Sequence, residues 1–281
     1  MTYSIKHIIK FYNKIGEKME LGVYVHIPFC VKKCYYCDFV SYPNRFEMQE
    51  DYIKKLIEEI LPRKNEFERP KVSNIDQAFI VTSLVHPDFS LNLLDKLLIL
   101  MKLHNVDAII CITKKDLVDE DKYQEVNSLL DYYRGLGYKV VSNQELDKIK
   151  KLIQNKTSVF TGQTGAGKST LLNKLNPNWN LETGEVSLAL GRGRHTTRVV
   201  ELFQIFGGKV MDTPGFSALD FDKYSKEEIR DAFIEFHNYP CPFKDCMHTK
   251  EKECVVKKAV LANDILDSRY KNYLSFIKED K

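Results

Sequence analysis

One stretch of the sequence combines glycines, a lysine and a hydroxyl group in the spacing that binds nucleotide phosphates. Residues Gly162–Ser169 fit the pattern G-x-x-x-x-G-K-[ST], with an apolar β-branched run at 157–161 before it and a helical pattern at 169–175 after it. Strand, glycine loop and helix form the context that this motif requires. Backbone N–H groups and the helix N-terminus would hold the phosphates, Lys168 would reach the β- and γ-phosphates, and Ser169 would ligate Mg²⁺. The expected phosphate contacts are Gly162, Gln163, Thr164, Gly165, Ala166, Gly167, Lys168, Ser169 and Thr170.

A second group of residues indicates which base is bound. Residues 109–113 are expected to form a strand that ends in Thr113, Lys114, Lys115 and Asp116, a variant of the pattern N-K-x-D. Asp116 could accept hydrogen bonds from N1–H and the N2 amino group of guanine, a donor pair that adenine lacks, and this disfavours ATP. Lys114 would lay its aliphatic stem along the base.

Thr113 stands where this pattern usually has asparagine. Threonine lacks the amide group, so one contact to the base or to neighbouring loops is expected to be weakened or rearranged. Residues 140–142 are expected to close another strand and to carry the second base-contacting loop.

The order of these motifs is unusual. In ordinary small GTPases the base-reading element follows the phosphate loop, whereas here Thr113–Asp116 precedes Gly162–Ser169. The sequence therefore predicts a circularly permuted domain.

Two further elements could respond to the γ-phosphate. Asp212 and Gly215 fit the pattern D-x-x-G, in which the carboxylate holds Mg²⁺ through a water molecule and the glycine N–H contacts the γ-phosphate. Residues 191–198 are rich in glycine and arginine and long enough for a switch loop, in which Thr196 or Thr197 could complete the Mg²⁺ shell. The alternative is a basic loop that only meets RNA or solvent.

Phe216 follows Gly215 where many GTPases have a glutamine that orients the attacking water. Phenylalanine cannot orient water, so hydrolysis is expected to be slow until another group does so. His195 is the candidate within the chain, and a partner macromolecule is the candidate outside it. A slow switch of this kind fits a regulatory or assembly role better than bulk catalysis.

Cysteine and histidine recur near the C-terminus with the spacing C-x₄-C-x-H-x₅-C, formed by Cys241, Cys246, His248 and Cys254. Three thiolates and one imidazole suit tetrahedral Zn²⁺. All four ligands come from the protein, so the predicted ion is structural and has no open position for a catalytic water. Residues 255–278 have apolar side chains at helical spacing and predict short packing helices.

Together, these motifs resemble the bacterial ribosome small-subunit-dependent GTPase A family, as do residues 61–77 and 87–91. The resemblance implies an α/β fold, with a circularly permuted P-loop GTPase domain at 61–222 and a zinc-binding helical domain at 223–281. It implies GTP hydrolysis that the 30S ribosomal subunit with its 16S rRNA stimulates, late in the maturation of that subunit. It also implies GTP, Mg²⁺ and one structural Zn²⁺ as the bound groups.

Residues 1–60 depart from this family, which normally begins with an oligonucleotide-binding barrel of five strands. Around Cys30, Cys34 and Cys37 they are similar instead to the start of radical S-adenosylmethionine proteins of the coproporphyrinogen-dehydrogenase and haem-chaperone type, where three such cysteines hold a [4Fe–4S] cluster. That chemistry needs a partial (β/α) barrel of on the order of 200 residues, which the chain before residue 77 cannot supply. We expect a truncated fragment with three free thiols or an idle cluster.

Composition further limits the number of domains, the kind of RNA contact and the compartment that we expect. The chain has 281 residues, 43% of them hydrophobic, which fits about two domains with a real core. Its net charge is only +3, so RNA affinity would depend on local patches such as the arginines of 191–198 and the lysines of 250–258. Six of the seven cysteines fall into the two metal-type clusters, which predicts a reducing cytoplasm. No signal peptide or membrane span is expected, and we expect a monomer.

Two other functions remain open at this point. One is a degraded or chimeric protein that binds guanine nucleotide or RNA with little turnover. The other is an iron–sulfur radical enzyme, which would be brown with absorbance near ~400 nm, as thiolate-held iron–sulfur clusters are.

Overall fold

The computed structural model describes residues 8–9, 23–24, 29–30, 42–43, 47, 50, 63–68, 71–179, 201–212 and 221–278. Backbone contacts divide the chain into two compact units, residues 1–62 and 63–281. Several predicted site residues lie outside the described residues: Cys34, Cys37, His195, Thr196 and Gly215.

The described part of the first unit includes two very short strand pairs. Strand β1 (Ile8–Ile9) pairs antiparallel with β2 (Val23–Tyr24), and β3 (Phe29–Cys30) pairs parallel with β4 (Tyr42–Pro43). Cys30 ends β3. Within these described residues there is no five-stranded barrel.

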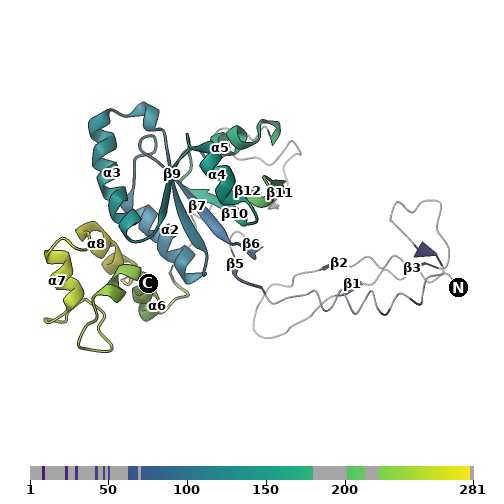
Figure 1. Ribbon diagram of the computed structural model, residues 1–281. Helices are drawn as coiled ribbons and strands as arrows, with labels where there is room; N and C mark the ends of the chain where they lie inside the picture. Colours follow the sequence, from purple (N-terminus) through teal and green to yellow (C-terminus); the bar gives the residue numbers. More distant parts are fainter. Residues whose placement is uncertain are drawn as a thin grey trace. The chain divides into compact units, whose positions relative to one another are not determined.

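The second unit is built on a six-stranded sheet with the order β11-β12-β10-β7-β8-β9. Its strands are β7 (Gln77–Ser83), β8 (Asp107–Thr113), β9 (Lys139–Ser142), β10 (Thr157–Gly162), β11 (Glu201–Ile205) and β12 (Gly208–Asp212). All neighbouring pairs are parallel except the β11–β12 hairpin (Figure 1). The central strands are nearly continuous runs of apolar residues, because helices cover both faces of a parallel sheet.

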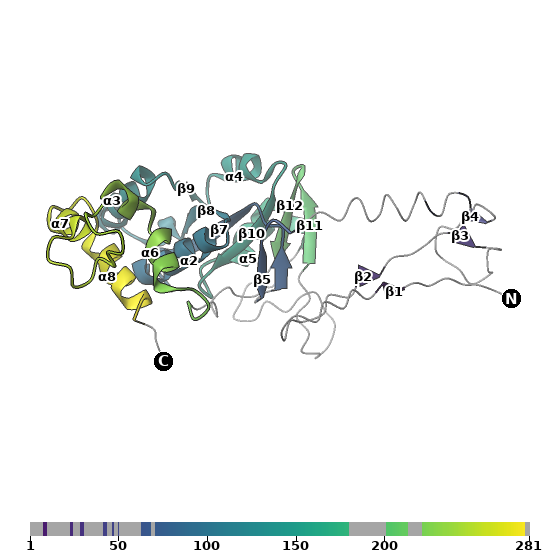
Figure 2. The same cartoon turned by 90° about the horizontal axis from the view of Figure 1, so that it is seen from below.

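Helices cover the two faces of this sheet. One face packs against α2 (Leu91–Leu103) and α3 (Glu120–Gly135), and the other against α4 (Leu146–Ile153) and α5 (Lys168–Leu175). Figure 2 shows the sheet between these layers. Alternate residues of the strands therefore enter two separate cores. This mixed α/β architecture confirms the predicted fold class.

Local sequence explains where the helices begin. The Ser90 hydroxyl accepts a hydrogen bond from the Leu93 N–H at 3.3 Å at the start of α2, and the Asp119 carboxylate accepts one from Lys122 N–H at 2.8 Å at the start of α3. Both cap residues satisfy N–H groups that have no partner inside the helix. Two 3₁₀ turns, η2 (Lys115–Leu117) and η3 (Pro177–Trp179), follow β8 and α5.

The remaining elements of the second unit precede and follow this sheet in the chain. A hairpin, β5 (Glu66–Glu68) with β6 (Lys71–Ser73), precedes β7. The C-terminal region contains α6 (Lys226–Ala232), η5 (Ile234–Asn238), α7 (Val255–Leu261) and α8 (Asp267–Phe276). Its apolar side chains join the same core as α2 and α3, and α8 lies beside α2 (Figure 1). Among the described residues, no helix is long and apolar enough to cross a membrane.

Candidate nucleotide site and metal centre

The predicted nucleotide motifs meet at one edge of the sheet. Gly162 at the end of β10 pairs with Val81 of β7, and Ser83 at the end of β7 pairs with Thr113 at the end of β8. Since these strands are parallel, their carboxyl ends lie together, where α/β sheets bind ligands. The base-reading strand β8 precedes the phosphate-loop strand β10 in the chain, with β7 between them in the sheet.

The phosphate loop has the backbone conformation that its glycines allow. Gly162, Gly165 and Gly167 have φ angles of 135°, 80° and 95°, which side chains rarely tolerate. A Cβ atom at Gly162 would lie 2.0 Å from the Val81 carbonyl oxygen. Glycine at this position therefore lets β10 run close to β7 before the loop turns into α5.

Lys168 begins α5, and its side chain folds back over the loop. Its ammonium group donates to the carbonyl oxygens of Gly162 and Gln163 at 2.8 and 2.9 Å. Ser169 and Thr170 follow in the first turn of α5. The lysine charge and the helix N-terminus thus converge on the mouth of the loop, which suits an anionic ligand.

The base-reading loop contacts the phosphate loop directly. Thr113 is 1% exposed, and its hydroxyl donates to the Ala166 carbonyl oxygen at 2.6 Å. Lys114 adopts a left-handed conformation (φ 58°), after which Lys115 and the exposed Asp116 lie in η2. The Thr113 hydroxyl therefore joins the loop after β8 to the phosphate loop.

A third loop borders this site that sequence reasoning did not assign to it. The Lys114 ammonium donates to the His86 carbonyl oxygen, and Pro87 Cδ lies 3.5 Å from where a Cβ atom of Gly165 would be. Ser83 fixes the loop by donating its hydroxyl hydrogen to the Pro87 carbonyl at 2.7 Å. The sequence indicates this role only through the position of the turn. The turn follows β7, and β7 pairs with the phosphate-loop strand β10.

The predicted second base loop follows β9, next to β8. Asn143 N–H donates to the Ile112 carbonyl at 2.9 Å, and the Ser142 N–H donates to the Glu145 carboxylate at 2.7 Å. This bond from the Ser142 N–H lowers the pKa of Glu145. The loop therefore lies one strand away from Thr113.

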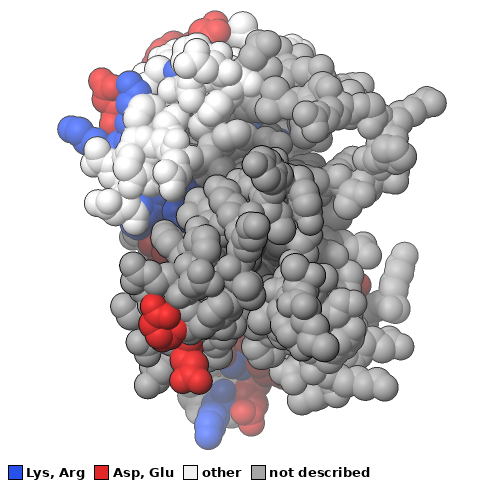
Figure 3. Space-filling view, turned by 90° about the vertical axis from the view of Figure 1, so that its right-hand side faces the viewer, with Lys and Arg blue, Asp and Glu red and all other residues white. Residues whose placement is uncertain are grey.

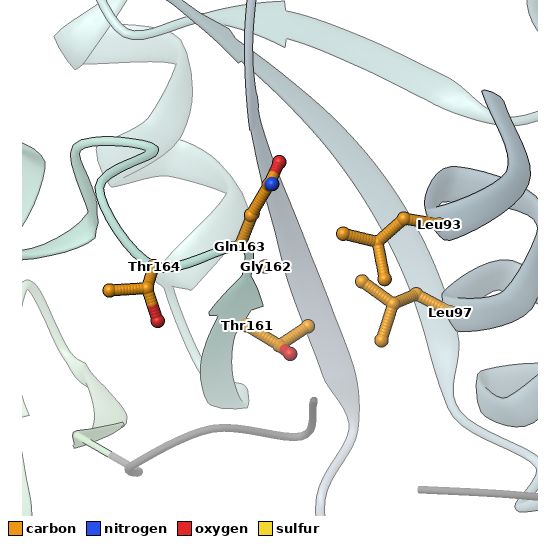
Figure 4. Close-up of a pocket in the computed structure, with 6 residues that line it drawn as sticks. All are labelled: Leu93, Leu97, Thr161, Gly162, Gln163 and Thr164. Atoms are coloured by element: carbon orange, nitrogen blue, oxygen red, sulfur yellow. The ribbon is translucent and has the colours of Figure 1, made fainter. Parts of the chain in front are cut away.

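A cleft of about 220 Å³ separates the start of the phosphate loop from α2 (Figure 4). Leu93 and Leu97 of α2 point towards Thr161 and Gly162 in this view. The Thr161 hydroxyl is buried and has no hydrogen-bond partner among the described residues. Helix α2 thus borders the phosphate loop on the face that also carries the C-terminal region.

Asp212 is the last residue of β12, and its backbone pairs with Phe160 of β10. The D-x-x-G motif therefore starts beside the phosphate-loop strand. Its side chain, Gly215, Phe216 and the loop 191–198 lie outside what the structure describes.

The four predicted metal ligands form one cluster. Their ligand atoms all lie within 4.8 Å of one another. Cys241 Sγ and Cys254 Sγ are 3.7 Å apart, and His248 Nδ1 lies 3.6, 3.4 and 3.2 Å from the sulfurs of Cys241, Cys246 and Cys254. Zinc bond lengths in a tetrahedron give edges of about 3.8 Å between sulfurs and about 3.6 Å between sulfur and nitrogen. The donor set and its spacing fit this ion.

The surroundings of the cluster hold its backbone in place. Tyr270 and Tyr273 of α8 donate their hydroxyl hydrogens to the carbonyls of His248 and Met247 at 2.6 and 2.5 Å. The Glu251 carboxylate accepts hydrogen bonds from two N–H groups of the same turn. Burial raises the pKa of the Cys246 thiol to about 12, so its thiolate form needs a nearby cation. A metal ion would supply it.

On the face shown in Figure 3, Lys and Arg lie next to Asp and Glu among the described residues. In the predicted lysine patch, Lys258 pairs with Glu253 at 2.8 Å, and Lys257 donates to the carbonyls of Thr249 and Glu251 at 3.2 Å. Two of its four lysines are therefore engaged within the protein.

The chain is similar in sequence to a known protein family and its members. The family model described as RsgA GTPase matches residues 60–222. The small ribosomal subunit biogenesis GTPase RsgA of Latilactobacillus sakei is 45% identical over 252 residues, which cover 87% of this chain and 83% of the relative. The protein of the same name from Enterococcus faecalis is 46% identical over 226 residues, covering 79% and 76%.

Solved structures agree with the fold. The crystal structure of YloQ, a circularly permuted GTPase, matches with a TM-score of 0.68 and 38% identity, covering 79% of this chain and 73% of that one. YjeQ from Thermotoga maritima matches with a TM-score of 0.68 and 36% identity, covering 78% and 76%. The motif order, the sheet and these matches agree, and the chain belongs to the RsgA GTPase family of GTP-hydrolysing enzymes.

Proposed function

We propose that this chain hydrolyses GTP to assist late maturation of the 30S ribosomal subunit, and that the subunit stimulates its turnover. One observation carries the nucleotide part. The predicted base-reading and phosphate loops, in permuted order, follow the parallel strands β8 and β10 on either side of β7, and the bond from Thr113 to Ala166 joins them. The ribosomal part is supported by the relatives, whose names place them in biogenesis of the small ribosomal subunit.

In this proposal the phosphate loop and Lys168 hold the β- and γ-phosphates, and Asp116 reads guanine. Ser169, Asp212 and Thr196 surround Mg²⁺, which would neutralise charge on the transferred phosphoryl group. Gly215 contacts the γ-phosphate, and His195 positions the attacking water in place of the glutamine that Phe216 replaces.

We further propose that residues 61–222 form the GTPase domain. Residues 223–281 form a second domain that Zn²⁺ stabilises by binding at the Cys₃His cluster. The protein would act in the cytoplasm as a monomer and contact 16S rRNA on the subunit. A [4Fe–4S] cluster at Cys30, Cys34 and Cys37 has no part in this function.

The test is GTP turnover by the purified chain with and without 30S subunits. We expect slow turnover alone and a rise of at least tenfold with subunits. Lys168→Ala serves as the control that removes turnover in both conditions. Turnover that 30S subunits leave unchanged would contradict the ribosomal role and favour a nucleotide-binding protein with little turnover. Absence of GDP and GTP binding would contradict the nucleotide site itself.

A further inference from the structure

Lys115 lies in the predicted base-reading loop, but its ammonium group contacts helix α3. The Lys115 Nζ atom lies 3.6 Å from the centroid of the Tyr123 ring, and both side chains are half-buried. The negative face of an aromatic ring attracts a cation, and this attraction increases where water is partly excluded. Lys115 therefore attaches the loop after β8 to α3.

The Tyr123 ring is held in place by the rest of the protein. It packs against the core formed by buried side chains of α2 and α3. Its N–H donates to the Asp119 carbonyl oxygen at 3.1 Å, in the turn that the Asp119 carboxylate caps. Tyr123 thus offers a fixed point on the helix that follows the loop.

The backbone carries this attachment to Asp116. The Leu117 N–H donates to the Lys114 carbonyl oxygen at 3.1 Å, and the Val118 N–H donates to the Lys115 carbonyl oxygen at 3.4 Å. These bonds close η2, a single 3₁₀ turn that contains Asp116. Hydrogen-bond geometry in such turns is poor, and Asp116 is exposed. A side-chain contact from within the turn to α3 therefore adds to its order.

We propose that Tyr123 is a positioning residue for guanine recognition, which fixes η2 through Lys115 and so places the Asp116 carboxylate. Lys115 serves as the bridge and does not touch the nucleotide. This inference rests on the proposed function, in which Asp116 reads guanine. A carboxylate that accepts two hydrogen bonds from one base must be held to within about 0.5 Å, and ordering it before binding lowers the cost that the ligand bears.

A positioning role differs from a merely structural one in what it does to base selection. A structural contact would change stability and leave the preference among bases as it is. Inosine diphosphate keeps N1–H but lacks the N2 amino group, so it can make only one of the two hydrogen bonds to Asp116. Displacing the carboxylate should therefore weaken GDP binding more than inosine diphosphate binding.

The experiment titrates the full-length chain with each nucleotide by calorimetry. Tyr123→Leu keeps an apolar side chain and removes the ring, and we expect it to weaken GDP binding about fivefold, the size of one cation–π contact at a partly exposed site. The preference for GDP over inosine diphosphate should fall. Tyr123→Phe keeps the ring and should stay within about twofold of wild type. Thermal unfolding checks that each variant is folded.

Lys115→Met should reproduce the loss seen in Tyr123→Leu, and combining the two should add less than about twofold, because both remove the same contact. Lys122→Met is the matched lysine control. Lys122 is 46% exposed and pairs with Glu125 at 2.8 Å, so its loss should leave GDP affinity unchanged. Fully additive losses in the combined variant would mean that Lys115 acts elsewhere, and this would overturn the bridge.

The cycle then repeats Tyr123→Leu in an Asp116→Ala background, where we expect its effect on GDP binding to fall below about twofold. An equal fivefold loss in both backgrounds, or an unchanged preference for GDP over inosine diphosphate, would overturn the positioning role. Unchanged GDP affinity in Tyr123→Leu would overturn it as well. Failure of the proposed function is distinct, since the wild-type chain itself would then not bind GDP.

Discussion

The guanidinium group of Arg269 on α8 donates to the Asp95 carboxylate on α2 at 2.6 Å, and both side chains are completely buried. Glu235 accepts a second hydrogen bond from Arg269, also at 2.6 Å. Asp95 further accepts hydrogen bonds from Tyr133 and Asn272 at 2.6 Å. Helix α2 therefore binds the C-terminal region through Asp95. The same helix lines the cleft beside the phosphate loop with Leu93 and Leu97.

Removing the central cation of this cluster should strongly destabilise the second unit. Arg269→Met would leave the two buried carboxylates of Asp95 and Glu235 without their cation, and we expect a loss of about 3–5 kcal/mol in the free energy of unfolding. Urea unfolding followed by circular dichroism measures it.

Lys271→Met provides the matched control on the same helix. Lys271 is 71% exposed and pairs with Asp267 on the surface, so its loss should cost less than about 0.5 kcal/mol. A similarly small cost for Arg269→Met would show that the buried cluster does not hold α8 to α2.

The metal cluster should stabilise the C-terminal region without setting nucleotide affinity. Cys246→Ser removes one ligand of the predicted zinc site, and its surroundings link to α8 through Tyr270 and Tyr273. We expect loss of bound zinc, faster proteolysis within residues 221–278, and a GDP dissociation constant within about twofold of wild type, since metal binding and local folding are coupled. Metal analysis and limited proteolysis check this.

Cys111→Ala is the matched cysteine control, because Cys111 is buried in β8 and its pKa is raised to about 12 by burial. It should retain zinc. A collapse of GDP affinity in Cys246→Ser would contradict the division between nucleotide site and metal centre.

Much of the site was predictable from local sequence. The expected strand 157–161 and helix 169–175 correspond to β10 (Thr157–Gly162) and α5 (Lys168–Leu175), and the strand 109–113 lies within β8. These segments were predictable because runs of hydrophobic residues and the positions of glycines favour a particular local backbone conformation. The clustering of the three cysteines and one histidine was predictable for a similar reason, since these residues are close in sequence.

Contacts between distant residues were not predictable in this way. Thr113 and Ala166 are 53 positions apart, and a threonine after a strand does not reveal which carbonyl it meets. Arg269 and Asp95 are 174 positions apart. Charged residues are usually exposed, so sequence alone favours a solvated surface for both. Only the packing of α8 on α2 brings them together and removes water.

Asp76 should make stability depend on pH. Its carboxylate accepts hydrogen bonds from Lys64 at 2.8 Å and from the Thr157 N–H at 2.7 Å, where β7 and β10 begin. Burial alone would raise the pKa of Asp76, but these two hydrogen bonds, together with the positive charges of Lys64 and Lys156, lower the pKa. A lowered pKa stabilises the fold above the unfolded value of about 3.9, and this stabilisation disappears as the pH falls through the lowered pKa.

Asp76→Asn should therefore be less stable than wild type at neutral pH, and the difference should shrink progressively below about pH 5. Urea unfolding between pH 7 and pH 3 measures the difference. Asp107→Asn removes a 76% exposed carboxylate, 3.5 Å from Lys156, and should change stability little. A constant difference between wild type and Asp76→Asn across this range would assign the effect to packing rather than charge.

Base selection should depend on the carboxylate of Asp116, which is exposed in η2 at the carboxyl end of β8. Asparagine presents an amide nitrogen that can donate to the O2 of xanthine, while it loses the acceptor pair for guanine. We expect Asp116→Asn to weaken GDP binding about 100-fold, the loss of two charge-assisted hydrogen bonds, and to gain affinity for xanthosine diphosphate. Asp119→Asn retains a capping oxygen for α3 and should leave both affinities unchanged. Calorimetric titration with the two nucleotides separates the cases, and GDP binding that survives Asp116→Asn intact would mean that another group reads the base.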